Sequence, residues 1–262
     1  MRKIILKCTT YVKNFISSRK FGFTLSEVLI TLGIIGIVAA LTIPSLIQKQ
    51  KEKITIVKIQ KAYSVLSQAY QYAVEEYGIP STWGITARTR NKAILARNIL
   101  FAKIKVSVKC DENDQSACNR AVNYYTKNST NPNTDISTAN TASVLTADGF
   151  TFFILTQDNK LMMRGSTPAL RSQYAWIYFD INGKKKPNTY GKDFFTFYLT
   201  DYGIIPVGTP EETGVADAWP FYSKDNRSCY NSGTGCTAWI LRQKNMNYLH
   251  SDKCSWTNTS CK

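Results

Sequence analysis

The stretch FGFTLSEVLI occupies residues 21–30 and opens an apolar run that continues to Ile47. Between residues 23 and 47, Glu27 is the only charged residue. A helix over this run would be about 37 Å long at about 1.5 Å per residue, enough to cross a hydrocarbon layer of about 30 Å. The run is therefore predicted to be a membrane-spanning helix.

The simplest alternative is a plain signal anchor, and two features argue against it. Glu27 places a carboxylate inside an apolar span, where an ionisable group is costly and needs a partner. The span also follows the step Lys20-Phe21-Gly22, whereas an ordinary secretory signal carries an A-x-A cleavage pattern at its far end.

These residues resemble the processing motif of type IV prepilins and type II secretion pseudopilins. In that motif a basic leader ends at a glycine, a phenylalanine follows, and a glutamate is the fifth residue of the mature chain. The resemblance implies that residues 1–22 form the leader, that prepilin peptidase cuts after Gly22, and that Phe23 becomes the N-methylated first residue. Glu27 is then fifth, and Pro44 lies where the family often has a proline.

The resemblance also implies a role for Glu27 in assembly. Its carboxylate would pair with the amine of Phe23 on a neighbouring subunit, and such a pair is strong at low dielectric compared with either charge alone. The amine of the same chain is the alternative partner, because it lies within the first helical turn. The predicted function is a structural, non-enzymatic subunit of a type IV pilus or a type II secretion pseudopilus, with prepilin peptidase and other pilin or pseudopilin subunits as partners.

The charge distribution predicts the orientation of the chain in the membrane. The 262 residues carry a net charge of +15, and the leader holds six basic residues and no acidic one, which leaves +9 (15 − 6) for the mature chain. A basic flank before an apolar span marks the cytoplasmic side. We therefore expect a single-pass protein of the inner (cytoplasmic) membrane with its C-terminal domain outside, which later joins a pilus or pseudopilus at the periplasm or cell surface.

The cysteines after the leader come in three close pairs, which predicts local disulfides in an oxidising compartment. Sequence alone does not choose among the possible pairings. Zinc is the alternative, but the chain has no C-x-x-C pair and a single histidine, His250. The six residues are Cys110, Cys118, Cys229, Cys236, Cys254 and Cys261.

The helix is predicted to continue beyond the membrane. Residues 23–47 would form the membrane-spanning and filament-core part, and residues 48–78 an amphipathic continuation that ends at Gly78, with Pro80 as the break. Helical spacing predicts a packing face for a sheet. That face contains Ile59, Ala62, Leu66, Ala69, Ala73 and Tyr77.

Residues 79–262 are predicted to form a globular extracytoplasmic domain with a disulfide-rich tail. We expect a second helix at 89–105 and a surface loop at 126–142. Predicted strands lie at 143–145, 151–155, 175–180, 194–199, 204–207 and 237–241. This order indicates an α+β fold, with one long N-terminal helix packed on an antiparallel sheet, which is also the pilin-like fold that the resemblance implies.

Two alternatives to a major structural subunit remain open. Residues 88–109 carry seven basic side chains and no acidic one, either as a solvated face or as a site for an anionic partner. The second interpretation predicts a minor (tip) pilin that binds DNA or a surface ligand. A membrane-anchored monomer that never assembles is the other alternative. The common nucleotide, metalloprotease and hydrolase motifs are missing, so no catalytic residue is predicted.

The stretch 180–193 has some features of a calcium loop. Carboxylate and amide side chains alternate before Gly183, as at the start of an EF-hand, but Gly191 stands where the twelfth-position glutamate is required. The secretion pseudopilins bind calcium in a loop near their C-terminal end. Four lysines in the stretch oppose a cation, and Asn-Gly turn chemistry is the alternative. The candidate ligands are Asp180, Asn182, Asn188 and Asp193.

Overall fold

A computed structural model describes residues 22–110, 123–125, 132–135, 140–158, 167–183, 188–211, 229, 233–251 and 253–262. The chain divides into two compact units, Met1–Gln48 and Lys49–Lys262. The long helix α1 (Leu25–Tyr77) has residues in both units.

The end of α1 follows the prediction closely. Gly78 adopts a φ of 77°, a left-handed conformation that glycine reaches without steric cost, and its amide bonds to the carbonyl oxygen of Val74 at 3.0 Å. The buried face in the second half of α1 contains five of the six predicted residues, together with Thr55. The prediction was wrong for Tyr77, which is 43% exposed because it lies in the last turn.

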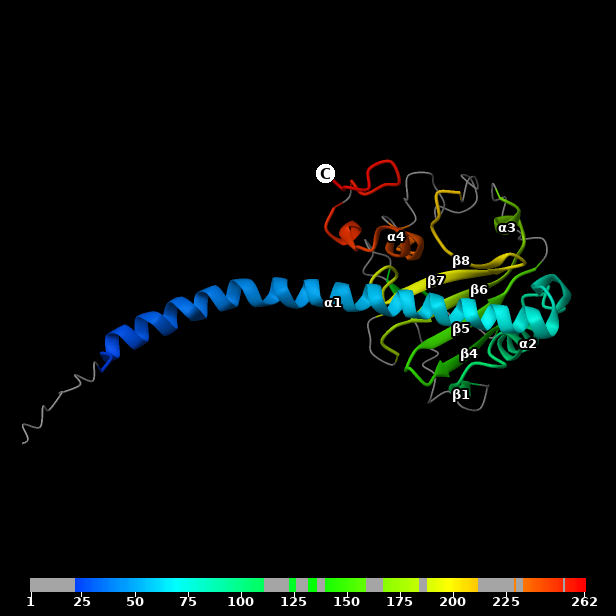
Figure 1. Cartoon of the computed structure of the whole chain (residues 1–262), viewed down its shortest axis with the longest axis horizontal. Helices are drawn as coiled ribbons and strands as arrows, with labels where there is room; N and C mark the ends of the chain where they lie inside the picture. Colours follow the sequence, from blue (N-terminus) through cyan, green and yellow to red (C-terminus); the bar gives the residue numbers. More distant parts are fainter. Residues whose placement is uncertain are drawn as a thin grey trace, which may run out of the picture. The chain divides into compact units, whose positions relative to one another are not determined.

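A six-stranded, fully antiparallel sheet forms the centre of the second unit, in the order β1-β4-β5-β6-β7-β8 (Figure 1). These strands are β1 (Val106–Cys110), β4 (Thr141–Thr146), β5 (Thr151–Thr156), β6 (Gln173–Asp180), β7 (Phe194–Thr200) and β8 (Gly203–Pro206). A separate hairpin joins β2 (Asn123–Tyr125) and β3 (Pro132–Asp135).

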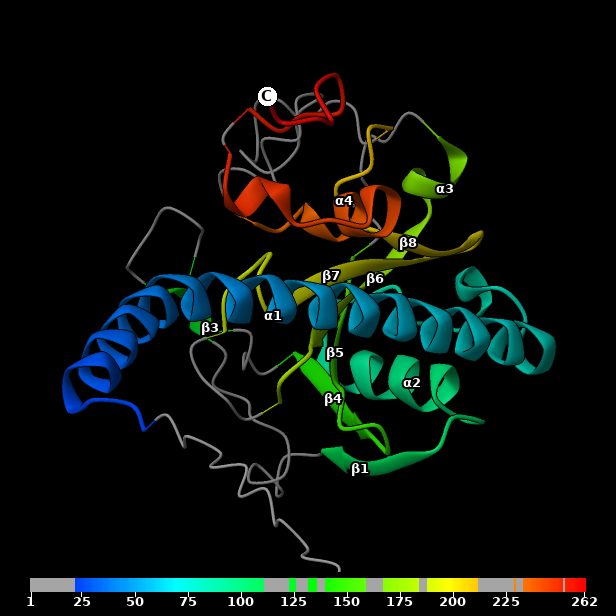
Figure 2. The same ribbon diagram turned by 60° about the vertical axis from the view of Figure 1, so that its left-hand side comes forward.

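One face of the sheet receives the helices. The second half of α1 and the helix α2 (Arg90–Leu100) lie against it, as Figure 2 shows. The rings of Tyr63 and Phe197 stack at this contact, with their centroids 6.1 Å apart. Since alternate residues of a strand point to opposite faces, the same strands supply a second aromatic cluster on the other face. That cluster contains Phe153, Leu155, Tyr178, Tyr190 and Phe194.

Burial on both faces explains why β5, β6 and β7 are almost continuously apolar or aromatic in sequence. The predicted strands from residue 143 to residue 207 agree with β4 to β8, so the α+β fold class is confirmed. The predicted second helix at 89–105 was too long, since α2 ends at Leu100, and the strand β1 that follows it was not predicted. The predicted loop 126–142 was wrong at β3 and at the start of β4, and residues 126–131 and 136–139 lie outside the described part.

The tail differs from the prediction. Residues 237–241 belong to the helix α4 (Cys236–Gln243), which lies beside β7 and β8. The segment has an apolar face at helical spacing and ends at Lys244, which adopts the left-handed conformation. A short apolar run cannot be assigned to helix or strand by periodicity alone, and here burial decided it. The described residues also form three shorter helices, η1 (Pro80–Thr82), α3 (Pro168–Arg171) and η4 (Asn247–Leu249).

Candidate functional site

The predicted cleavage position lies directly before α1. Gly22 and Phe23 are both exposed, and nothing lies within 4 Å of the position that a Cβ atom on Gly22 would take. Among the described residues, nothing therefore covers the backbone between Gly22 and Phe23. The rest of the leader, residues 1–21, lies outside the described residues.

Thr24 and Glu27 form a reciprocal pair at the start of α1. The backbone amide of Thr24 donates to Glu27 Oε2 at 2.8 Å, and the amide of Glu27 donates to Thr24 Oγ1 at 3.2 Å. The Thr24 hydroxyl also donates to Glu27 Oε2 at 2.8 Å. This is the capping box of a helix N-terminus, which satisfies amides that have no partner within the helix.

The capping role of Glu27 was missed in the sequence, although the spacing Thr-x-x-Glu was a readable signal for it. In the full-length chain, the carboxylate of Glu27 therefore accepts hydrogen bonds from Thr24 of the same chain. Its predicted amine partner can exist only after cleavage, so the pairing of Glu27 with Phe23 stays a prediction.

The first half of α1 presents apolar side chains to its surroundings. Among the described helices, α1 alone is long and apolar enough to cross a membrane. Pro44 lies inside the helix, where its ring leaves one helical hydrogen bond unmade, yet the helix continues through it. Exposed apolar surface of this extent needs a membrane or other apolar surfaces around it.

Comparison with known proteins agrees with this N-terminal arrangement. The profile of the family described as "Prokaryotic N-terminal methylation motif" matches residues 17–43. Residues 17–43 therefore carry an N-terminal methylation motif, which supports the resemblance to type IV pilins and pseudopilins. No curated protein and no solved structure matches it. The long helix packed against an antiparallel sheet agrees with the α+β, pilin-like fold that the resemblance implies.

The second candidate site is the connection between β6 and β7. Asp180 Oδ1 accepts hydrogen bonds from the amides of Asn182, at 2.9 Å, and Gly183, at 3.0 Å. Asp193 Oδ1 accepts from the amide of Thr189, and Asp193 Oδ2 accepts from Asn182 Nδ2 at 3.1 Å. Half of the carboxylate oxygens therefore accept from backbone amides of the turn, and the two carboxylates belong to one hydrogen-bond network.

Several oxygens of this connection have no hydrogen-bond partner among the described residues. They are Asp180 Oδ2, Asn182 Oδ1 and Asn188 Oδ1, and each is buried. Asp180 is 1% exposed and Asn188 is 2% exposed. A buried polar atom without a partner is costly and is rare in native proteins, so such a group calls for a ligand or water.

The electrostatic setting of the two aspartates is unusual. Burial raises the pKa of Asp180 to about 7, and the neighbouring charge of Asp193 adds to the rise. Burial likewise raises the pKa of Asp193 to about 6, although the hydrogen bond from Thr189 opposes the rise. A bound cation would compensate the negative charge of the two buried carboxylates and so favour their ionised forms.

The donor set fits a hard cation better than a soft one. It offers carboxylate and amide oxygens, which are calcium ligands, and residues 180–193 contain neither histidine nor cysteine. Within the described ranges, no three His, Cys, Asp or Glu side chains gather as a metal cluster. The four candidate ligands therefore supply part of a calcium shell, and carbonyls or water would have to complete it.

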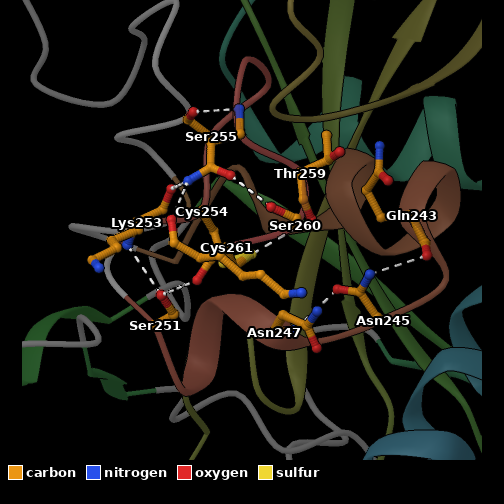
Figure 3. The surroundings of a disulfide bond; sticks show 12 residues. Gln243, Asn245, Asn247, Ser251, Lys253, Cys254, Ser255, Thr259, Ser260 and Cys261 are labelled. Carbon is orange, nitrogen blue, oxygen red and sulfur yellow. Dashed lines mark hydrogen bonds between the residues drawn. A yellow bond between two sulfur atoms is a disulfide. The ribbon is translucent and has the colours of Figure 1, made fainter.

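Two disulfides hold the C-terminal region. Cys229 is joined to Cys236, and Cys254 to Cys261, which are local pairs. Near the second bond, Ser251 Oγ donates to the carbonyl oxygen of Cys261 at 2.8 Å (Figure 3). Cys110 is also disulfide-bonded, and Cys118 lies outside the described residues.

The basic segment 88–109 does not form one free cationic surface. Arg97 is 2% exposed, and it donates to the carbonyl oxygens of Cys110, at 3.2 Å, and Ser143, at 3.3 Å. Lys103 pairs with Glu76 at 3.0 Å. Arg97 thus joins α2 to the sheet, and the prediction of an anionic partner gains nothing from the geometry of these two side chains.

Proposed function

We propose that this chain is a structural subunit that prepilin peptidase cuts after Gly22 and that assembles through α1 into a type IV pilus or a type II secretion pseudopilus. The observation that carries the proposal is the N-terminal methylation motif at residues 17–43, placed on a capped apolar helix. Before assembly the chain is anchored in the inner membrane with residues 49–262 outside the cytoplasm.

The capping pair supports a specific order of events. Cleavage frees the amine of Phe23, one residue before the amide that already binds Glu27. In the membrane the carboxylate then has its own amine and amide as partners. In a bundle of helices, the amine of a neighbouring subunit takes the place of the chain's own amine, and this exchange sets the stagger between subunits.

The proposal is tested by the site of processing. The Gly22→Leu variant should accumulate as uncut precursor, because a side chain obstructs the close backbone approach that a peptidase needs. Gly33→Leu is the matched control, since nothing lies within 4 Å of either glycine's Cβ position. N-terminal sequencing should give a start at Phe23 for the wild type and the control. A different start, or normal cleavage of the Gly22→Leu protein, would overturn the proposal.

The tip-subunit and monomer alternatives differ from this proposal in stoichiometry. A major subunit should dominate sheared filaments, a tip subunit should be present in traces, and a monomer should stay in the membrane. Quantitative mass spectrometry of the sheared fraction separates these outcomes. Trace amounts or exclusive membrane retention would remove the major-subunit assignment.

We also propose that the β6–β7 connection binds calcium through Asp180, Asn182, Asn188 and Asp193. The buried oxygens without a partner carry this proposal. A ligand at about ten times its dissociation constant adds about 1.4 kcal/mol to stability, which raises the unfolding midpoint by about 3 °C. We expect this rise when calcium in the millimolar range is added to chelator-treated full-length protein in a nonionic detergent.

The control for calcium binding is a carboxylate elsewhere in the same unit. Asp180→Asn should lose the calcium-dependent rise. Asp148→Asn should keep it, because Asp148 lies in the β4–β5 turn and pairs with Lys61 at 3.0 Å instead of with the four candidate ligands. A wild-type midpoint that does not change with calcium would leave Asp180 and Asp193 as turn-forming residues only.

A further inference from the structure

Lys58 reaches the proposed calcium loop from α1. Its ammonium group donates a hydrogen bond of 3.0 Å to the carbonyl oxygen of Ile181, which lies between Asp180 and Asn182 in sequence. The amide of Ile181 in turn donates to the carbonyl oxygen of Asp193 at 3.1 Å. The side chain of Lys58 is therefore fixed on the backbone that separates two proposed ligands.

The charge of Lys58 also acts on the loop. Asp180 is buried next to the carbonyl that Lys58 holds, so the positive charge of the ammonium group compensates the negative charge of the Asp180 carboxylate. A cation bound in the loop would interact with the same carboxylate, that of Asp180. Moreover, the carbonyl that Lys58 holds is itself the kind of oxygen that calcium accepts.

We propose that Lys58 is a tethered counter-ion of the β6–β7 connection and that it competes with the metal ion for this site. The inference rests on the calcium site proposed above and adds its regulation. In the metal-free protein, the ammonium group compensates the carboxylate charge and binds α1 to the loop. When a divalent ion enters, repulsion between the two cations drives the ammonium group out and frees the Ile181 carbonyl oxygen.

Removing a side-chain contact usually weakens a site, but here we expect removal of the Lys58 charge to raise the calcium affinity. Loss of the Lys58 charge should strengthen calcium binding by at least about fivefold, because a unit charge about 8 Å from a divalent ion opposes its binding even in a medium of high dielectric constant. Lys58→Met keeps much of the length of the side chain but removes the charge, and Lys58→Arg keeps the charge. The arginine variant should therefore bind calcium like the wild type.

Lys61 supplies a matched control. It lies three residues further along the same helix and pairs with Asp148 at 3.0 Å, so Lys61→Met changes the net charge equally and leaves the hydrogen bond from Lys58 to Ile181 in place. Calcium titration of the chelator-treated full-length proteins in nonionic detergent, followed by calorimetry, compares the four chains. The expected order of affinity places Lys58→Met above the wild type, Lys58→Arg and Lys61→Met, which should agree with one another.

A second measurement needs no variant. An amine-acylating reagent should modify Lys58 several-fold faster in calcium than in chelator, while Lys61 should react at the same rate in both. Peptide mass spectrometry reads both sites in one sample, so the result does not depend on the folding of a mutant. An unchanged or slower rate at Lys58 would show that it does not leave the loop.

The outcomes separate the two proposals. If the wild type binds calcium and Lys58→Met binds it equally or more weakly, the counter-ion role is wrong and the site stands. If the wild type does not bind but Lys58→Met does, competition is confirmed in its strongest form. If neither chain binds calcium at 10 mM (a concentration of about ten times a millimolar dissociation constant), both proposals are overturned.

Discussion

The buried hydroxyl of Tyr248 donates a hydrogen bond of 2.6 Å to the carbonyl oxygen of Gly191. Tyr248 belongs to η4, whereas Gly191 lies in the β6–β7 connection. A Cβ atom on Gly191 would come within 2.9 Å of Cys236 Sγ, so the disulfide-bonded region packs closely on the same residue. The C-terminal region thus supports the loop that carries the proposed calcium ligands.

Tyr248→Phe should lower the free energy of unfolding by about 1–3 kcal/mol, because it leaves a buried carbonyl oxygen without its donor. Tyr202→Phe is the control, since Tyr202 is 68% exposed and its loss of a hydroxyl should change little. Denaturant unfolding of the full-length proteins measures both. Equal midpoints for Tyr248→Phe and the wild type would show that the hydrogen bond contributes nothing.

The capping role of the Thr24–Glu27 pair and the proposed assembly role of Glu27 can be separated by mutation. Glu27→Gln keeps an oxygen that can accept from the Thr24 amide but removes the charge, whereas Thr24→Ala weakens the cap and keeps the charge. We expect both chains to insert in the membrane, and only Glu27→Gln to be strongly depleted from sheared filaments. Equal depletion of both variants would assign the assembly role to the cap.

Removing the two described disulfides should have unequal effects. Closing a loop of this length is worth about 2.5 kcal/mol through the entropy of the unfolded chain. Cys229 and Cys236 are fully buried, and Cys236 packs beside Gly191, so their double alanine variant should also lose packing. The Cys254/Cys261 double variant is the comparison. The Cys229/Cys236 variant should have the lower melting temperature of the two. A lower melting temperature for the Cys254/Cys261 variant would contradict this account.

Gly208 should tolerate no side chain. Its φ of 95° is left-handed, and a methyl group built on it would overlap the carbonyl group of Gly235. Gly149 has a similar φ of 81° but open space around it. Gly208→Ala should therefore cost on the order of 3 kcal/mol or more, and Gly149→Ala about 1 kcal/mol of backbone strain. Similar melting temperatures for the two variants would show that the backbone segments at Gly208 and Gly235 can move apart to admit a methyl group.

The raised pKa values of Asp180 and Asp193 predict a pH dependence of stability in metal-free protein. Their folded-state values of about 7 and about 6 lie above the ordinary value of 3.8, so the folded chain binds more protons than the unfolded chain within this interval. The contribution of these groups to stability is then present below about pH 4 and is lost as the pH rises to about 7.

The difference in melting temperature between the wild type and Asp180→Asn isolates this dependence from the other acidic groups. In chelator, the wild type should lose stability relative to the variant as the pH rises from about 4 to about 7. Added calcium should reduce that loss, because a bound cation favours the ionised carboxylate. A difference that stays constant over this interval would show that Asp180 titrates normally.

The sequence by itself determined the elements whose signals are local. The apolar run, the glycine at position 78 and the Thr-x-x-Glu spacing lie within a few residues of the structure they specify. The strands from β4 to β8 were readable for the same reason, since β-rich apolar runs are bounded by turn residues. The methylation motif is likewise contained in 27 consecutive residues, 17–43.

Tertiary structure decided what depends on residues far apart in the chain. Residues 237–241 became helix because one side of the short segment is buried against β7 and β8, an environment that a pattern of five residues does not encode. Lys58 meets Ile181 across 123 residues, and Tyr248 meets Gly191 across 57. Likewise, only folding shows which oxygens of Asp180 and Asn188 are used by the backbone and which remain buried without a partner, because burial and pairing are properties of the packed chain.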